Sequence, residues 1–347
     1  MDKQRANAFM LKLVGDVATT LAATLVLVGD RLGLFRAMAG SGALSPAELA
    51  GRAGIAERYA EEWLAVMAGA GYVEHEAGRF RLPDEHAQFL VDPASEYCLT
   101  GLFAGLPSMA AMVPKLTEAF RSGGGIGFED FGAELPEALA AMNRSVYEQR
   151  LVRSWLPMVP GVVERLQAGG RALDVGCGAG VIPIALARAF PAATVAGIDP
   201  DVRSIALARA AADAAGVQLQ FDAVGIDAMA AAPGWDFVST FDVVHDLPDP
   251  LAALQRIRAG LAPGGTYLMV EPKVADALDD NLGNPFARML YGISCLHCVP
   301  QSLALGGPGL GACWGEQRAR ALAERAGFRR FERLDIRSPA MAFYALG

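Results

Sequence analysis

The chain has 347 residues, 53% of them hydrophobic and 20% charged, with a formal net charge of −8. This length is typical of two domains with sizeable cores. The acidic balance argues against a nucleic-acid or anionic-membrane surface, because phosphate binding needs clustered Lys and Arg. Five cysteines without a regular framework favour a reducing compartment. We therefore expect a soluble, cytoplasmic protein.

The N-terminal segment predicts a long apolar helix. Residues 7–39 are rich in Ala and Leu with helical spacing, and no strong helix breaker precedes Gly40. Its uncharged part, Val17–Gly29, has 13 residues and is too short to span a bilayer. The apolar stripe of this helix packs either on a second copy, which would make a homodimer, or on its own chain, and the sequence favours neither.

Residues 44–90 predict a winged-helix arrangement. Helices are expected over Pro46–Ala53 and Glu57–Ala70, followed by a hairpin over 72–82. Residues 42–92 contain nine acidic residues against four Arg, a net charge of −5, so DNA binding is disfavoured. We interpret residues 1–95 as a dimerisation and substrate-wall domain.

Residues 96–150 predict a helical linker around the glycine-rich loop 122–127. Four glycines in this loop indicate either a mobile connector or backbone that lies close to a ligand; an ordinary linker fits equally well. A helix over Tyr147–Leu166 is expected to lead into the third region, residues 151–347.

The third region predicts a doubly wound α/β fold. Its apolar runs alternate with helical segments, which indicates a parallel sheet closed by an antiparallel pair. The expected strands are 172–175, 193–198, 218–224, 235–244, 266–270, 329–336 and 342–346, with helices at 250–258 and 316–326.

A glycine-rich turn follows the first of these strands. Gly176, Gly178 and Gly180 follow Asp174 at every second position, and Asp199 ends the next strand. Glycines there let the backbone pass close to a ligand, and a carboxylate at the second strand tip suits the two hydroxyls of a ribose. The spacing is G-x-G-x-G, without the third glycine of a dinucleotide fingerprint.

The stretch DVGCGAG, together with LAPGGTYLMVE, resembles the class I S-adenosylmethionine (SAM) dependent methyltransferases. The resemblance implies a Rossmann-like core of seven strands and SAM as the cofactor. It places Asp174 near the methionine part of SAM and Asp199 on its ribose. The residues implied to contact the cofactor are Asp174, Gly176, Cys177, Gly178, Gly180, Asp199, Pro200, Ile226, Asp227 and Phe241.

Two residues near the carboxyl ends of neighbouring strands predict acid–base chemistry. His245 follows the strand 235–244, and Glu271 ends the strand 266–270. A His with a carboxylate beside it forms an oriented general base. The segment FDVVHD resembles small-molecule O-methyltransferases of the plant phenolic and bacterial polyketide type, in which the His is the base and the Glu orients it. The alternative is that His245 caps the next helix and proximity alone drives transfer.

Cys295, His297 and Cys298 offer potential metal ligands in the segment that precedes the last helix. Structural zinc sites need four ligands, and no second Cys/His cluster completes this one, so we predict no metal. We interpret residues 293–317 as an apolar lid or pocket wall at the acceptor.

The whole chain resembles bacterial SAM-dependent methyltransferases with an N-terminal winged helix, the Rv2258c-like type. The resemblance rests on GLF, ERYAEEWL, RLPDEHAQFL, the RSGGG loop, LDVGCG, FDVVHD and the ISCLHC to GACWGEQ insertion. It implies methyl transfer to a small apolar or aromatic acceptor, as in natural product biosynthesis. Two alternatives remain: a SAM-binding winged-helix regulator, and a SAM-retaining enzyme with non-methylating chemistry.

Overall fold

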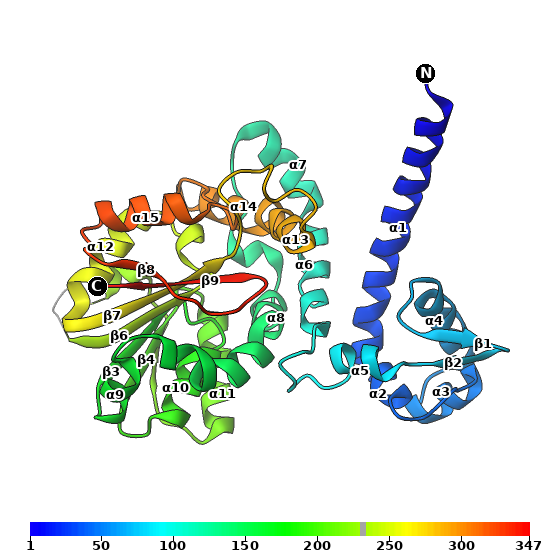
Figure 1. The fold of residues 1–347 in the computed structure, drawn as a ribbon, viewed down its shortest axis with the longest axis horizontal. Coiled ribbons are helices and arrows are strands. Elements are labelled where there is room, and N and C mark those ends of the chain that lie inside the picture. The colour runs from blue at the N-terminus through cyan, green and yellow to red at the C-terminus, as the bar shows by residue number, and fades with distance from the viewer. Residues whose placement is uncertain (230–233) are drawn as a thin grey trace. The chain divides into compact units, whose positions relative to one another are not determined.

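The computed structural model describes residues 1–229 and 234–347, which form two compact units (Figure 1). The first unit contains residues 1–107 and 141–146, and the second contains residues 108–140 and 147–347. The domain boundaries that the sequence suggests, near residues 95 and 150, remain predictions. Each unit is described by itself.

The first unit begins with two helices where one was expected. α1 spans Lys3–Arg31 and α2 spans Leu34–Met38. The expectation of one helix over 7–39 is wrong because Gly33 between them adopts a left-handed conformation, with φ of 66°, that ends the first helix. Trp63 fixes α1 to the rest of the unit, since its Nε1 donates to the carbonyl of Leu25 at 2.9 Å.

Most of the surface of α1 is exposed in the single chain. Leu11, Val14, Val17 and Leu21 are each about 60% exposed. By length and composition the helix could also cross a membrane, which differs from the expectation drawn from its uncharged part alone. Lys12 and Asp16 form an ion pair within the same helix.

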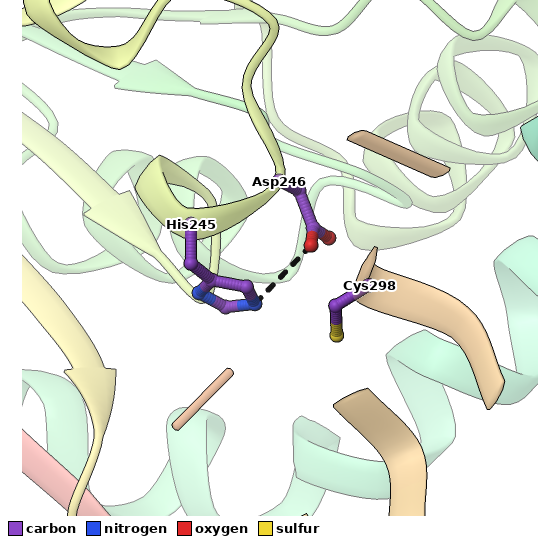
Figure 2. Close-up of side chains that lie close together, drawn as sticks. All are labelled: His245, Asp246 and Cys298. Atoms are coloured by element: carbon purple, nitrogen blue, oxygen red, sulfur yellow. Dashed lines mark ion pairs between the residues drawn. The ribbon is translucent and has the colours of Figure 1, made fainter. Parts of the chain in front are cut away.

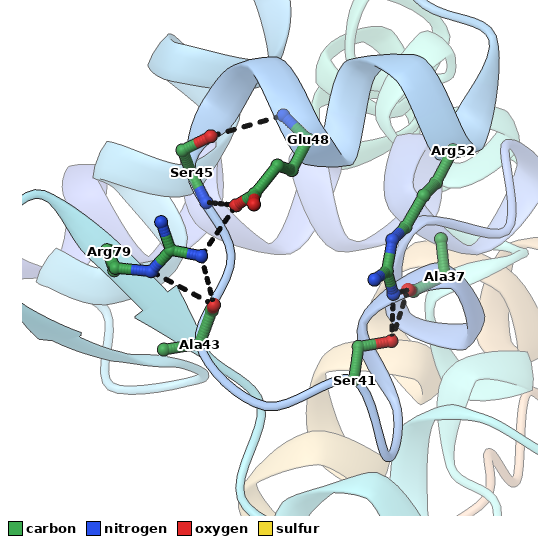
Figure 3. Close-up of polar contacts among 7 residues, drawn as sticks. All are labelled: Ala37, Ser41, Ala43, Ser45, Glu48, Arg52 and Arg79. Carbon is green, nitrogen blue, oxygen red and sulfur yellow. Dashed lines mark hydrogen bonds and ion pairs between the residues drawn. The ribbon is translucent and has the colours of Figure 1, made fainter.

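The remainder of the first unit forms the winged helix. α3 (Pro46–Ala53) begins with a capping box between Ser45 and Glu48, and α4 spans Glu57–Gly69. β1 (Glu74–Glu76) and β2 (Arg79–Arg81) form the antiparallel wing, followed by α5 (Asp84–Leu90). Figure 3 shows how Arg79 ties the wing to α3, donating to the carbonyl of Ala43 and to Glu48 at 2.7 Å each.

The second unit is built on a seven-stranded sheet in the order β5-β4-β3-β6-β7-β9-β8. The first five strands in this order are parallel, and β9 runs antiparallel to β7 and β8, which confirms the predicted fold class. The strands are β3 (Arg171–Val175), β4 (Thr194–Ile198), β5 (Gln220–Asp222), β6 (Trp235–Phe241), β7 (Leu261–Pro272), β8 (Phe331–Arg333) and β9 (Met341–Leu346).

Helices cover both faces of this sheet (Figure 1). α10 (Val181–Ala189) and α11 (Val202–Ala215) lie on one face, and α12 (Pro250–Gly260) and α15 (Glu316–Arg325) on the other. The core on the second face includes Leu254 and Ala323, both fully buried against the strands. This layering leaves the carboxyl ends of the parallel strands at one edge, where ligands bind in such folds.

Two further predicted elements have different bounds in the structure. The expected helix over Tyr147–Leu166 is divided, because α9 begins only after Gly161, which has a φ of 73°. The strand predicted to reach Val244 ends at Phe241, since Asp242 is left-handed, with φ of 56°.

The other helical segments of the described chain connect the elements named so far. They are η1 (Thr100–Phe103), α6 (Leu106–Ala111), α7 (Val113–Ser122), η2 (Phe128–Phe131), α8 (Leu135–Arg150), η3 (Leu151–Trp155), η4 (Leu156–Met158), α9 (Val162–Gln167), η5 (Ile226–Ala228), η6 (Val244–Asp246), α13 (Pro285–Ile293), η7 (Ser294–Cys298) and α14 (Val299–Ala304).

Candidate active site

The glycine-rich turn after β3 lies at the carboxyl end of the parallel strands, where its backbone carries few side chains. Gly176, Gly178 and Gly180 all adopt left-handed conformations. A Cβ on Gly176 would lie 2.5 Å from Val243, and one on Gly180 would lie 2.8 Å from Phe221, so close packing requires these two glycines. A Cβ on Gly178 would meet nothing within 4 Å. The middle of the turn therefore faces open space.

Asp199, at the tip of β4, is joined to this turn. Its Oδ2 accepts from the backbone N–H of Gly178 at 3.0 Å, and its Oδ1 accepts from that of Asp201 at 2.9 Å. Burial raises the pKa of Asp199, while the two backbone N–H groups lower it. The structure thus brings the predicted strand-tip carboxylate and the glycine turn into direct contact.

Asp174 lies inside β3 and is only 2% exposed. Its Oδ1 accepts from the hydroxyl of Ser239, on the neighbouring strand β6, at 2.6 Å. Burial raises the pKa of Asp174 to about 7, against the lowering effect of Ser239, and the nearby charge of Asp199 raises it further. In the described part of the chain, neither carboxylate has a Lys or Arg partner. A cationic ligand at this edge would therefore stabilise both carboxylates.

The other residues predicted to contact a cofactor lie along the same edge. Cys177 is buried in the glycine turn, and its backbone N–H donates to the carbonyl of Ile198. Pro200 is exposed directly after Asp199. Ile226 and Asp227 follow β5 in the short helix η5, and Phe241 ends β6. The parallel strands thus bring the predicted set to one edge, although contact with a ligand stays a prediction.

His245 lies in η6, four residues beyond the end of β6, and is buried. Its Nδ1 is 2.5 Å from Oε2 of Glu271, the next-to-last residue of β7. The same carboxylate accepts from the backbone N–H of Val244 at 3.0 Å and from Trp314 Nε1 at 2.9 Å. The His–Glu pair predicted from the sequence is therefore formed. Asp249, rather than His245, caps α12.

The other ring nitrogen of His245 points toward Asp246 and Cys298 (Figure 2). Nε2 lies 3.4 Å from Asp246 Oδ1, and the three potential ligand atoms of these residues lie within 4.8 Å of one another. Because Glu271 accepts a hydrogen bond from Nδ1–H, Nε2 is the nitrogen left to exchange a proton with a bound molecule. Sequence reasoning identified neither Asp246 nor Cys298 as a neighbour of this nitrogen.

The charge of His245 is set by its two carboxylate neighbours. Burial alone lowers the pKa of His245, but the charges of Asp246 and Glu271 outweigh it and hold the pKa well above its usual range. The ring is thus an imidazolium near neutral pH. To act as a base it has to lose that proton first, so proton acceptance by His245 strengthens as the pH rises.

His245, Asp246 and Cys298 offer one nitrogen, one oxygen and one sulfur donor to a metal ion. Burial raises the pKa of the Cys298 thiol to about 12, so the thiol keeps its proton, whereas a metal binds the thiolate. Three donors also leave a tetrahedral site one ligand short. Cys295, which the sequence grouped with Cys298, is exposed and lies outside this cluster.

A second buried carboxylate, Asp242, borders the site. The hydroxyl of Tyr147 donates to its Oδ2 at 3.1 Å, and burial raises the pKa of Asp242 to about 6. A left-handed, non-glycine residue at a strand end is strained backbone of the kind that collects at functional sites. Only the aspartate of FDVVHD marks this position in the sequence, and nothing there indicates its conformation.

The segment 293–317, which we call the lid, supplies the side chains opposite η6. Its π-helical turn η7 holds Cys298 and His297, both only 4% exposed. His297 packs edge-on against Phe131, with ring centroids 4.8 Å apart. π-Helical turns are frequent at functional sites. The predicted lid is thus partly polar where it meets His245.

Comparison with known protein families identifies two regions of the chain. Residues 166–333 match the family model described as a methyltransferase domain, and residues 20–92 match an Rv2258c-like winged HTH domain. Ubiquinone biosynthesis O-methyltransferases of Bordetella avium and Paracidovorax citrulli are 33% and 36% identical over 113 and 100 residues. These matches cover 32% and 28% of this chain. The chain spans only 44% and 41% of those relatives' lengths.

Solved structures resemble the fold of nearly the whole chain. An O-methyltransferase family protein from Burkholderia thailandensis has a TM-score of 0.69 at 16% identity, covering 97% of both chains. Human N-acetylserotonin methyltransferase in complex with SAM has a TM-score of 0.67 at 18% identity, covering 100% of this chain and 98% of that one. At these identities the likeness shows the fold.

Replacing Asp174 with Asn should stabilise the ligand-free protein at pH 8. The folded-state pKa of about 7 exceeds the ~3.9 of an unfolded Asp, so folding opposes ionisation; the penalty grows as the pH rises from about 4 to about 7 and is constant above that. We expect a gain of roughly 1–3 kcal/mol at pH 8 and almost none at pH 4, where Asp174 is protonated in the folded state. Urea unfolding at both pH values measures it. An equal effect at both would contradict the assignment.

Proposed function

We propose that this chain, which belongs to the methyltransferases with an Rv2258c-like winged helix, transfers a methyl group from SAM to a hydroxyl of a small acceptor. The observation that carries the proposal is the buried His245–Glu271 pair beside a glycine turn with a strand-tip carboxylate. Both lie at the carboxyl edge of one parallel sheet. The reaction thus has a cofactor site and a base within the same unit.

The residues at this edge fit SAM by their chemistry. SAM carries a sulfonium and an ammonium, and the edge offers the carboxylates of Asp174 and Asp199, which lack a basic partner in the described residues. Asp199 uses only one bond per oxygen within the chain, so its oxygens can accept two ribose hydroxyls. The bare backbone at Gly178 leaves room for a ligand against the turn.

When bound, SAM supplies a methyl group that is already electrophilic because it is attached to a sulfonium. The chain therefore has to position an acceptor and remove its proton. Glu271 holds the imidazole through Nδ1, and Nε2 takes the proton from the acceptor oxygen. Trp314 and Val244 fix the Glu271 carboxylate, which in turn keeps the imidazole in one orientation.

Replacing His245 with Ala should lower methyl transfer by about 10²–10⁴-fold, the usual contribution of general-base catalysis. Because the pKa of His245 is raised, wild-type kcat/KM should increase with pH through a value above the ordinary ~6.5, and the variant should lack this rise. The measurement is single-turnover transfer to a phenol against pH, with product masses. His75→Ala, at an exposed residue of the first unit, is the control.

A loss smaller than about tenfold in His245→Ala would mean that proximity carries the step and that His245 is structural. Product masses without an added methyl group would instead indicate non-methylating chemistry at the same edge.

The winged helix, on this proposal, does not read DNA. All four arginines of residues 42–92 already have partners within the unit. Arg58 pairs with Glu61 and Glu62. Arg79 pairs with Glu48 and Arg52 donates to Ser41 (Figure 3). Arg81 pairs with Glu74. Three of these four cations are already paired with carboxylates, which weakens the positive field that phosphate binding needs. A wall or dimerisation role suits this unit better.

We further propose that α1 pairs with α1 of a second copy. Met10, Val14, Val17, Leu21 and Val28 are exposed apolar residues. With Thr24 they follow the alternating four- and three-residue spacing of a coiled-coil seam. A membrane-spanning helix would be apolar all round, whereas Lys12 and Asp16 lie within α1. The spacing therefore favours a homodimer.

Val14→Glu should shift the protein from dimer to monomer, because it buries a charge in the proposed seam. Light scattering of the full chain at micromolar concentration measures this. Thr19→Glu, on another face of the same helix and also exposed, is the matched control and should stay dimeric. A wild-type protein that is monomeric at this concentration would contradict the proposal.

The cellular setting completes the proposal. The five cysteines are all free, as suits a reducing compartment. Together with a net charge of −8, this supports a cytoplasmic enzyme of small-molecule metabolism, such as natural product biosynthesis.

A further inference from the structure

A surface groove of about 640 Å³ lies between the start of α12, the glycine-rich part of the lid and α15. α12 and α15 are neighbours on the face of the sheet opposite α10 and α11 (Figure 1). The groove has the volume of a small-molecule site, and much of its wall is apolar, formed by Leu251, Leu310, Leu322 and three prolines. Apart from Trp314, the residues that line it have no part in the proposed methyl transfer.

The buried residue Ser302 fixes the glycine-rich wall of the groove. Its hydroxyl donates to the carbonyl of Leu247 at 3.4 Å and accepts from the N–H of Gly309 at 3.2 Å. A Cβ on Gly307 would lie 2.8 Å from the Cα of Pro248, so the close approach of the lid to the start of α12 requires glycine. The backbone that bounds the groove is therefore held in place by the fold.

α15 lines the groove with two arginines that flank an apolar stretch. Arg318, Ala321, Leu322 and Arg325 recur at the spacing of one helix face. Both arginines are exposed, and neither forms a hydrogen bond or an ion pair within residues 1–229 and 234–347. Their separation of seven positions corresponds to about 10 Å along the helix axis. Two free cations thus lie at the two ends of one apolar strip.

The charge of the groove comes from these arginines and one carboxylate. Asp249 also lines the groove, and its Oδ1 accepts from the backbone N–H of Ala252 as the cap of α12. Two arginines against one aspartate leave a single positive charge, in a chain whose formal net charge is −8. A monoanion matches this balance better than a phosphate dianion does, and a guanidinium can bind a carboxylate through two parallel hydrogen bonds.

We propose that this groove is a second small-molecule site, which binds an apolar monocarboxylate of the medium-chain fatty acid class. The carboxylate pairs with one of the two arginines, and the chain lies along Leu322 between them. One residue joins this site to the candidate active site, because Trp314 lines the groove and donates from Nε1 to Glu271 Oε2 at 2.9 Å. An occupant therefore lies one side chain away from the carboxylate that orients His245.

The experiment is calorimetric titration of the full chain, saturated with S-adenosylhomocysteine, with octanoate and with octan-1-ol. The two probes share one chain and differ in charge. We expect octanoate to bind about fivefold more tightly than octan-1-ol at low salt, the upper range for an exposed ion pair, and the preference to shrink as salt is added. In the double variant Arg318→Gln/Arg325→Gln the ratio should fall to about one.

Arg188→Gln, at an exposed arginine of α10 on the other face of the sheet, is the matched control and should keep the wild-type preference. The double variant changes only exposed side chains, so it should unfold at the same urea concentration as the wild type. Failure of octanoate to bind, equal affinities of the wild type for the two probes, or an unchanged ratio in the double variant would overturn the proposal. Binding is measured without turnover, so these outcomes are independent of methyl transfer, which the product masses report.

Discussion

The carboxylate of Glu271 is the point on which the site depends. It is 2% exposed and receives the Nδ1 of His245, the indole N–H of Trp314 and the backbone N–H of Val244. A buried charge needs hydrogen bonds to offset its desolvation, and these three groups come from two segments far apart in the chain, η6 and the residues around Trp314. The imidazole of His245 therefore takes this orientation only when β7, η6 and the segment around Trp314 are all in place. Loss of any partner would leave the carboxylate undersatisfied and the ring free to turn.

The parallel sheet converts sequence order into this arrangement. Strands β3, β4, β5 and β6 all end at one edge, so side chains that follow each strand gather there without being close in sequence. For this reason the sequence alone was sufficient to pair His245 with Glu271 and to place the glycine turn and Asp199 at the same end of the sheet, although the bond between Gly178 and Asp199 was not predicted. In each case the argument needed only the strand ends and the parallel direction.

The sequence did not predict contacts made by residues in long connections between strands, because no strand end places those residues. Trp314 lies 43 residues after Glu271, and Cys298 reaches Asp246 from a π-helical turn that no hydrophobic pattern marks. The expected helices over 7–39 and 147–166 failed at Gly33 and Gly161, whose left-handed conformations only tertiary packing selects. Asp242 shows the same limit more strongly, because a non-glycine residue there gives no signal at all.

The site also explains why its residues are costly to the ligand-free protein. Asp174 and Asp199 have hydrogen bonds but no Lys or Arg partner in the described residues, and burial raises the pKa of both. Such groups are tolerated where ligands complete them. A cation bound at the glycine turn would offset the charge of these two carboxylates.

The most direct test of this account is calorimetry of SAM binding to the wild type and to Asp199→Asn, which keeps an acceptor oxygen for the turn but removes the charge. The account predicts measurable binding to the wild type and a loss of roughly 1.5–3 kcal/mol in the variant. Asp213→Asn, an exposed carboxylate near the far end of α11, should bind like the wild type. Absence of SAM binding, or equal affinity in Asp199→Asn, would contradict it.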